Sequence, residues 1–187
     1  GITLANAGGT VDVAAGTYLV SSQIDLNKTN LTLKGAGSAS TIVQVSGTGE
    51  RFFISAGGTT LEDMTIEKTD KAGVQNIIYI GASNVTIRDN VVHGQFVIGE
   101  GDVSRAMVVS GGLSGLQIEG NTFYSLRQPA YLTGPTTGNI INNYTYGTKG
   151  WVMEGGDMTF TGNTWGSGPQ TNVYDIVILS LAPLSAY

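Results

Sequence analysis

The charged side chains that could do chemistry gather at two positions of this 187-residue sequence. Glu62 and Asp63 stand together, and Arg88 and Asp89 follow 26 residues later. If the chain brings the two positions side by side, Asp63 and Asp89, together with Glu62, could hold a calcium ion, which prefers several oxygen ligands. Arg88 would then be placed as a base. The alternative, which we favour, is a column of solvated ion pairs, each contributing less than about 1 kcal/mol to stability.

A second candidate site is aromatic. His93, Tyr124 and Tyr146 each stand three residues after an asparagine. Rings at equivalent positions of a repeat would form a strip, and sugars pack their C–H faces on aromatic planes while polar ring edges form hydrogen bonds. We therefore predict that these three residues bind carbohydrate. The competing interpretation is that loops cover the strip and the rings are packing residues.

The elements that must position these residues repeat along the chain. The pattern is an apolar residue, any residue, an apolar residue, two residues, asparagine, any residue and an apolar residue. Three clear copies, one degenerate copy and one copy with methionine in place of asparagine are found at 85–92, 116–123, 158–165, 140–145 and 61–66. The key positions are spaced by 26, 31, 22 and 20 residues. Such spacings are typical of the coils of a solenoid.

Each copy follows a second apolar stretch and a glycine-rich corner. These stretches are 52–54, 77–80, 107–109, 130–132 and 151–153. Two to three short strands per coil, each alternating apolar and polar residues, indicate a β-helix with one buried face per strand.

The repeated asparagines have a structural explanation. Coils of a β-helix stack about 4.8 Å apart, so equivalent residues lie over one another. A stacked amide can donate to the amide of one neighbouring coil and accept from the other. We predict such a structural ladder for Asn90, Asn121, Asn143 and Asn163.

Composition excludes several classes of protein. No run of 18 apolar residues is present, so the sequence predicts no transmembrane helix. The absence of cysteine excludes disulfides and cysteine-ligated metals, and a single histidine makes a histidine-rich metal site improbable. The net charge of -5 argues against a nucleic-acid partner. Low charge together with abundant Gly, Ser, Thr and Asn favours an exported protein at the cell surface or outside the cell.

Several segments resemble a known superfamily. The stretch 10–18, followed by Leu-Thr-Leu-Lys-Gly-Ala-Gly at 31–37 and Thr-Ile at 41–42, resembles the N-terminal coils of pectin-lyase-like right-handed parallel β-helix proteins. The recurrent asparagine coil resembles the same superfamily. The resemblance implies an all-β fold, a single-stranded right-handed parallel β-helix of about seven coils, over residues 1–187 as one domain. It also implies polysaccharide lyases, hydrolases, epimerases, phage tailspikes and surface adhesins as functional classes.

The catalytic motifs of those enzymes are missing. Polygalacturonase-like members carry Asn-Thr-Asp, Asp-Asp, Gly-His-Gly and Arg-Ile-Lys segments, whereas His93 stands in Val-Val-His-Gly. The Trp-x-Asp-His element of pectate lyases and the Asp-Pro-His element of epimerases are also missing. In lyase-like members an Arg or Lys base removes a proton beside a uronate carboxylate that calcium neutralises. That role would fall to Arg88, with calcium at Asp63 and Asp89.

Two corner loops could carry function, since loops inserted between coils often do. The longer is 94–105, with Glu100, Asp102 and Arg105, and the shorter is 125–129, with Arg127. We predict a non-catalytic extracellular or cell-surface module, part of a larger exported protein, that binds a polysaccharide or serves as a scaffold, without a cofactor. One alternative is a small polysaccharide lyase or epimerase that uses calcium. Another is a subunit that self-associates end to end through its open coils.

Overall fold

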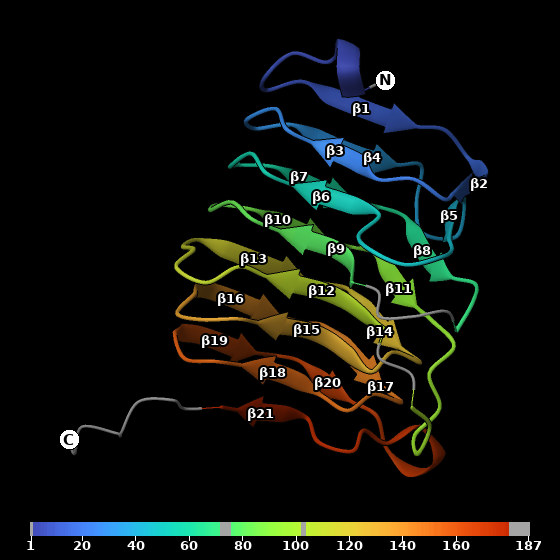
Figure 1. Cartoon of the computed structure of the whole chain (residues 1–187), viewed down its shortest axis with the longest axis vertical. Coiled ribbons are helices and arrows are strands. Elements are labelled where there is room, and N and C mark those ends of the chain that lie inside the picture. Colours follow the sequence, from blue (N-terminus) through green and yellow to red (C-terminus); the bar gives the residue numbers. More distant parts are fainter. Residues whose placement is uncertain (1, 72–75, 102–103, 180–187) are drawn as a thin grey trace.

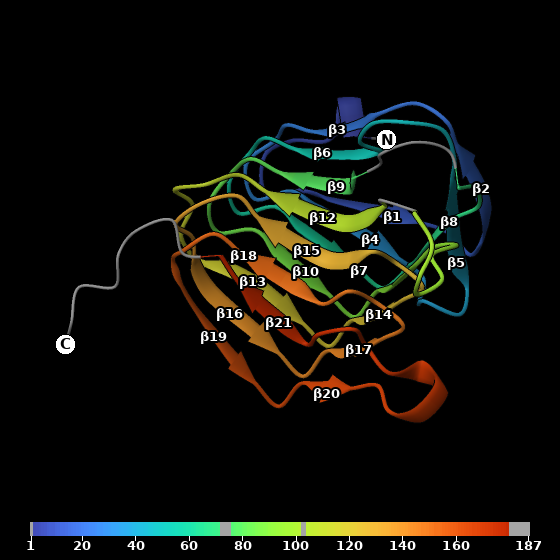
Figure 2. The same cartoon turned by 60° about the horizontal axis from the view of Figure 1, so that its bottom comes forward.

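The computed structural model describes residues 2–71, 76–101 and 104–179. The chain winds through seven coils, and each coil adds one strand to each of three parallel sheets (Figure 1, Figure 2). The helical segments of the described chain are two 3-10 turns, η1 (Ile2–Leu4) and η2 (Gly168–Gln170). Neither these turns nor any other described segment forms a helix long and apolar enough to cross a membrane. The predicted all-β parallel solenoid of about seven coils is confirmed.

The three sheets run the full length of the solenoid. Sheet A consists of β1 (Thr10–Val13), β4 (Thr32–Gly35), β7 (Thr60–Glu62), β10 (Thr86–Arg88), β13 (Leu116–Glu119), β16 (Thr137–Ile141) and β19 (Asp157–Thr161). Sheet B consists of β2 (Gly16–Val20), β5 (Thr41–Val45), β8 (Thr65–Lys68), β11 (Val91–His93), β14 (Thr122–Tyr124), β17 (Tyr144–Tyr146) and β20 (Thr164–Trp165). Sheet C consists of β3 (Ile24–Leu26), β6 (Phe52–Ile54), β9 (Asn76–Ile80), β12 (Arg105–Val109), β15 (Gln128–Leu132), β18 (Trp151–Met153) and β21 (Ile176–Ile178).

Alternation along each strand fills the interior of the tube. In β5, Val43 and Val45 are buried while Gln44 between them is half-exposed, as a strand with one buried face requires. Because the strands are in register, inward residues form columns, such as Ile66, Val92 and Phe123 on three successive coils. The rings of Phe123 and Trp151 meet edge to face at 5.4 Å between centroids, a favoured aromatic arrangement.

The corners of the coil differ in length. Only Asp89 and Asn90 separate β10 from β11, so the turn from sheet A to sheet B is tight. The segment from β11 to β12, in contrast, runs from 94 to 104 and carries the extra residues of the longest repeat. The corner between sheets B and C is therefore where the fold can present loops to a ligand.

Two buried cations fix the corner between β5 and β6. The guanidinium of Arg51, which is 6% exposed, donates hydrogen bonds to the backbone carbonyls of residues 46 and 48–50. Lys68 is fully buried, and its ammonium lies 2.7 Å from a carboxylate oxygen of Asp70. The other oxygen of Asp70 accepts the backbone N–H of Gly47 at 2.8 Å. Each buried charge is thus satisfied inside the fold, as burial demands.

Candidate functional site

Asp63 and Asp89 lie at the tight turn between sheets A and B. Both have left-handed backbone conformations, with φ of 60° and 55°. The equivalent residues of the following coils are Gly120, Asn142 and Gly162, also with positive φ. Asp, Asn and Gly are the residues that tolerate this conformation best. The residue types at this position are therefore explained by the turn.

From Asp89 onward, each turn residue is followed by an asparagine, and the amides of these asparagines are bonded from coil to coil. The Nδ2 of Asn90 donates to Oδ1 of Asn121 at 3.3 Å, and the bonds from Asn121 to Asn143 and from Asn143 to Asn163 measure 3.0 and 3.1 Å. Each Oδ1 accepts a second hydrogen bond, of 2.9–3.0 Å, from the backbone N–H of the preceding asparagine. Asn90, Asn121 and Asn143 are 1% exposed. These amides are occupied by the chain itself and serve its architecture.

The outward face of sheet A carries an alternating column of charges. Cross-strand register aligns Lys34 with Glu62, Glu62 with Arg88, and Arg88 with Glu119. The Glu62 carboxylate is 3.1 Å from Lys34 Nζ and 2.5 Å from an Arg88 nitrogen, and its side chain is only 4% exposed. Burial alone would raise the pKa of Glu62, but hydrogen bonds from Arg88 and Lys34 hold that pKa below its ordinary value.

This geometry bears on the calcium-site alternative. Glu62 is held by two cations, and Asp63 is 3.1 Å from Lys34 Nζ. Across the ranges that the structure describes, no group of three or more His, Cys, Asp or Glu side chains could hold a metal ion. The hydrogen bond to Glu62 also raises the pKa of Arg88, which opposes the loss of a proton that a base requires. Glu62 is thus paired with Lys34 and Arg88, and Asp63 with Lys34, while calcium at Asp63 and Asp89 stays a prediction.

The aromatic column lies on the outward face of sheet B. His93 is opposite Tyr124, and Tyr124 is opposite Tyr146. Ring centroids are 4.6 Å apart for the first pair and 4.9 Å for the second, with interplanar angles of 4° and 1°. All three side chains are half-buried. Both faces of the Tyr124 ring are therefore covered by its neighbours, and a sugar can reach the edge of this ring but not its plane. Carbohydrate binding by His93, Tyr124 and Tyr146 stays a prediction.

A cluster of cations lies at the corner between sheets B and C. The backbone N–H of Arg127 donates to the Ser104 carbonyl at 2.9 Å, and that of Lys149 donates to the Arg127 carbonyl at 2.8 Å. Arg105 begins β12, directly after Ser104. These bonds place Arg105, Arg127 and Lys149 on three successive coils at one corner.

Arg105 is held against a tyrosine in the middle of this cluster. Its guanidinium carbon lies 5.1 Å from the centre of the Tyr131 ring, within cation–π range. Its Nε donates to Oε1 of Gln128, and the hydroxyl of Tyr131 donates to Glu154. Burial, followed by the charge of Arg127, lowers the pKa of Arg105. The hydrogen bond to Glu154 is the main cause that raises the pKa of Tyr131, so the phenol is a donor and not a base.

The nine lysines and arginines of the chain differ in whether they form ion pairs, and this difference distinguishes the corner. Four cations form ion pairs with carboxylates, namely Lys34, Lys68, Lys71 and Arg88. Arg51 is satisfied by backbone carbonyls. The remaining four have no carboxylate within 4 Å in the described part of the chain, and three of them are Arg105, Arg127 and Lys149. Unpaired positive charge in an acidic protein is thus concentrated at one corner.

Sequence reasoning identified only part of this site. It singled out the loops that contain Arg105 and Arg127, but not Lys149, Tyr131 or Glu154. The signal that could have found Lys149 is its spacing of 22 residues from Arg127, which is the asparagine spacing of the same two coils. Asp102, also named in the longer loop, lies outside the described residues.

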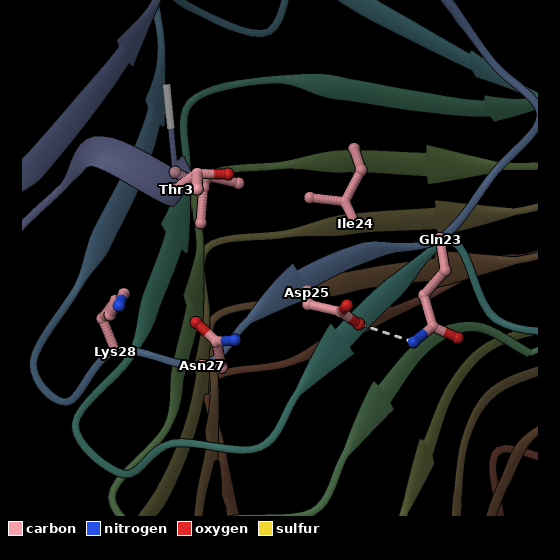
Figure 3. Close-up of a pocket in the computed structure, with 7 residues that line it drawn as sticks. Thr3, Gln23, Ile24, Asp25, Asn27 and Lys28 are labelled. Carbon is pink, nitrogen blue, oxygen red and sulfur yellow. Dashed lines mark hydrogen bonds between the residues drawn. The ribbon is translucent and has the colours of Figure 1, made fainter.

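A hollow of about 390 Å³ lies at the N-terminal end of the solenoid, beside β3 (Figure 3). Its polar lining includes Gln23, Asp25 and Lys28. The side-chain amide of Gln23 donates to Asp25 at 2.6 Å, so part of that polarity is already satisfied. The carboxylate of Asp25 and the ammonium of Lys28 line this hollow, so its charge is balanced. The corner that carries Arg105, Arg127 and Lys149, which we call the basic corner, has no such balance in the described chain.

No protein-family model and no curated protein matches the chain. Among solved structures, the A-module of the Azotobacter vinelandii mannuronan C-5 epimerase AlgE6 matches 92% of this chain, with a TM-score of 0.52 and 17% identity. The catalytic domain of a GH87 alpha-1,3-glucanase matches 90% of this chain, with a TM-score of 0.45 and 18% identity.

The comparison defines the class of fold. The chain spans 58% of the length of the epimerase module and 40% of the glucanase domain. At 17% identity, the likeness to the epimerase module shows the fold alone. The parallel β-helix fold that the sequence predicted is confirmed.

Proposed function

We propose that this chain is a non-catalytic, extracellular or cell-surface β-helix module that binds anionic polysaccharide along the corner between sheets B and C. The observation that carries the proposal is the run of Arg105, Arg127 and Lys149 on successive coils without carboxylate partners in the described chain. Like charges placed together cost free energy unless an anion joins them. Arginine guanidinium groups suit carboxylates and sulfates because their donors form a planar fork.

The repeat of the fold suits a polymer. The backbones of successive coils are about 4.8 Å apart. Arg127 and Lys149 follow one another at this corner, and Arg105 lies one residue further along its own coil, opposite Gln128. A polymer lying parallel to the solenoid axis would therefore meet one basic residue on each of three coils. The edges of Tyr124 and Tyr146 flank the same corner on sheet B, and their hydroxyls can bond sugar hydroxyls. The fold likeness to a mannuronan epimerase module is consistent with a glycan partner.

The experiment is a binding titration against anionic and neutral polysaccharides. Polymannuronate, polygalacturonate and dextran are titrated into wild-type protein and the variants Arg127→Ala and Lys28→Ala. Lys28 is the matched control, because it has no carboxylate within 4 Å in the described chain and lies after β3, far from the corner. We expect Arg127→Ala to weaken binding of an anionic polymer about tenfold, equivalent to about 1.4 kcal/mol. Lys28→Ala should bind as the wild type does, and salt should weaken binding.

Three outcomes would overturn the proposal. The first is binding of dextran as tight as that of the polyuronates, and the second is a loss of affinity in Lys28→Ala as large as that in Arg127→Ala. Formation of unsaturated or epimerised products from either polyuronate would contradict the non-catalytic assignment.

A further inference from the structure

A second feature of the same corner is a hollow of about 250 Å³. It is lined by Phe96, Val97, Ile98, Ser125, Gly147 and Pro169. The first three belong to the loop after β11, and Pro169 belongs to η2, the 3-10 turn after β20. Ser125 and Gly147 follow β14 and β17 directly. The hollow thus has a floor from coils five and six and walls from the loops of coils four and seven.

Both walls are fixed to the floor by backbone hydrogen bonds. The N–H of Phe96 donates to the Ser125 carbonyl at 2.9 Å, and the N–H of Gly147 donates to the Gln170 carbonyl at 3.0 Å. The Phe96 ring is 2% exposed, and the ammonium of Lys149 lies 5.6 Å from its centre. The hollow is therefore preformed, as ligand sites usually are.

The hollow adjoins the basic corner. Arg127 is two residues beyond Ser125, and Lys149 is two residues beyond Gly147. Lys149 belongs to both features, because its backbone extends the row of cations and its ammonium touches the ring at the base of the loop. A polymer held by the cations would bring its substituents over the hollow.

The lining is chemically mixed. Val97 and Ile98 are 55% and 44% exposed. The loop is anchored by the buried Phe96, and the two branched aliphatic side chains that follow it are accessible to solvent. Gly147, with φ of 62°, contributes no side chain and keeps the floor open. The Ser125 hydroxyl forms no hydrogen bond with the described residues, which leaves it able to donate. Aliphatic walls with a hydroxyl donor suit a small group that has a methyl end and a carbonyl oxygen.

We propose that this hollow receives an O-acyl substituent, such as an acetyl ester, of the anionic polysaccharide. The inference rests on the proposed function and narrows its ligand class to acylated anionic glycans. The methyl group packs on Val97, Ile98 and Pro169, and the ester carbonyl accepts from Ser125. Each buried methyl group contributes to affinity, so the acylated polymer is favoured over the same polymer without its esters by about fourfold or more.

The test compares O-acetylated polymannuronate with the same preparation after mild alkaline removal of its esters. Wild-type protein should bind the acetylated form at least fourfold more tightly. The double variant Val97→Ser, Ile98→Ser should bind both forms equally, with wild-type affinity for the deacetylated form. Leu19→Ser is the matched control, because Leu19 is 83% exposed on β2 of the first coil, away from the hollow. Melting curves verify that the variants are folded.

The outcomes separate the two proposals. Equal binding of both polymers by the wild type, with binding still lost in Arg127→Ala, would overturn the acyl pocket and leave the basic corner standing. Binding of neither polymer would overturn the proposed function and this inference with it. A preference that persists in the double variant would also overturn the pocket, because the selecting contacts would then lie elsewhere.

Discussion

The ring of Tyr124 lies 4.9 Å from the ring of Tyr146, with only 1° between their planes. His93 covers the opposite face of Tyr124 at 4.6 Å. A surface tyrosine with both faces occupied behaves as part of the fold and offers a partner only its edge. We therefore expect the aromatic column to contribute more to the stability of the fold than to the binding of a ligand.

Replacing Tyr124 with alanine removes two stacked contacts. We expect a loss of about 1–3 kcal/mol in the free energy of unfolding, measured by chemical denaturation, because each aromatic pair contributes about 0.5–1.5 kcal/mol. Tyr124→Phe keeps the stack and should be nearly as stable as the wild type, while losing an edge hydroxyl. Tyr18, 37% exposed on the first coil, is a control whose alanine variant should cost less. Equal losses for Tyr124→Ala and Tyr18→Ala would show that stacking contributes nothing.

Asn121 occupies the middle of the buried asparagine column. Its Oδ1 accepts from both the backbone N–H and the Nδ2 of Asn90. The Nδ2 also donates to the carbonyls of Leu61 and Arg88, so Asn121→Ala leaves one buried donor, the backbone N–H of Asn90, without an acceptor. Such a group costs about 1–3 kcal/mol, and we expect the free energy of unfolding to fall by about that amount. Asn163 at the end of the column is half-buried, so water can replace its side chain and Asn163→Ala should cost less. An Asn121→Ala variant as stable as Asn163→Ala would contradict this account.

Glu62 should make the free energy of unfolding depend on pH in the acidic range. Its pKa is lowered in the folded state by Arg88 and Lys34, so the folded protein holds this proton less tightly than the unfolded chain, whose ordinary pKa is 4.5. The stabilisation is fully present above pH 4.5 and is lost as the pH falls through the lowered folded pKa. Glu62→Gln should be less stable than the wild type at neutral pH, and the gap should close in acid. Denaturation curves at several pH values would refute this if the gap were constant.

His93, the single histidine, can be followed by itself in a nuclear magnetic resonance titration. Burial lowers its pKa below the ordinary value of 6.5, and the nearby Glu67 only partly opposes that effect. Because the unfolded chain binds this proton more tightly, His93 should contribute stability above pH 6.5 that is lost as the pH falls through its folded pKa. A midpoint above 6.5, or the same pH dependence of unfolding in His93→Gln, would refute the prediction.

The fold could be predicted because the same residue types recur at equivalent positions of successive coils. Asn90, Asn121 and Asn143 recur at one position of the coil, and the residue before each is Asp, Gly or Asn, as the left-handed turn requires. Apolar alternation then predicts the inward face of strands such as β5 and β13. Both signals depend only on residues that are close in sequence and on the stacking of equivalent residues on successive coils.

The candidate site was harder to predict because it depends on what each charge contacts. Arg88 and Arg127 are the same residue type, yet Arg88 is 2.5 Å from Glu62, while Arg127 has no carboxylate within 4 Å in the described chain. Register alone could place Glu62 beside Arg88, but not show that Lys34 completes the pairing from the preceding coil. The aromatic column was placed correctly in register, but its ring orientations depend on side-chain rotamers, which a sequence pattern does not contain.

The tight turn closes in the same way on the last four coils, with a left-handed residue and then an asparagine of the hydrogen-bonded column. Deleting the residues between two such turns would remove one coil. The coils on either side of the deletion would then stack on each other through equivalent strands and turns. Genes for chains of this kind can therefore lengthen or shorten in frame by whole coils without redesign of the interior. Each coil gained or lost would lengthen or shorten the proposed binding corner by one coil, so the length of polymer that the proposed site spans can evolve separately from the fold.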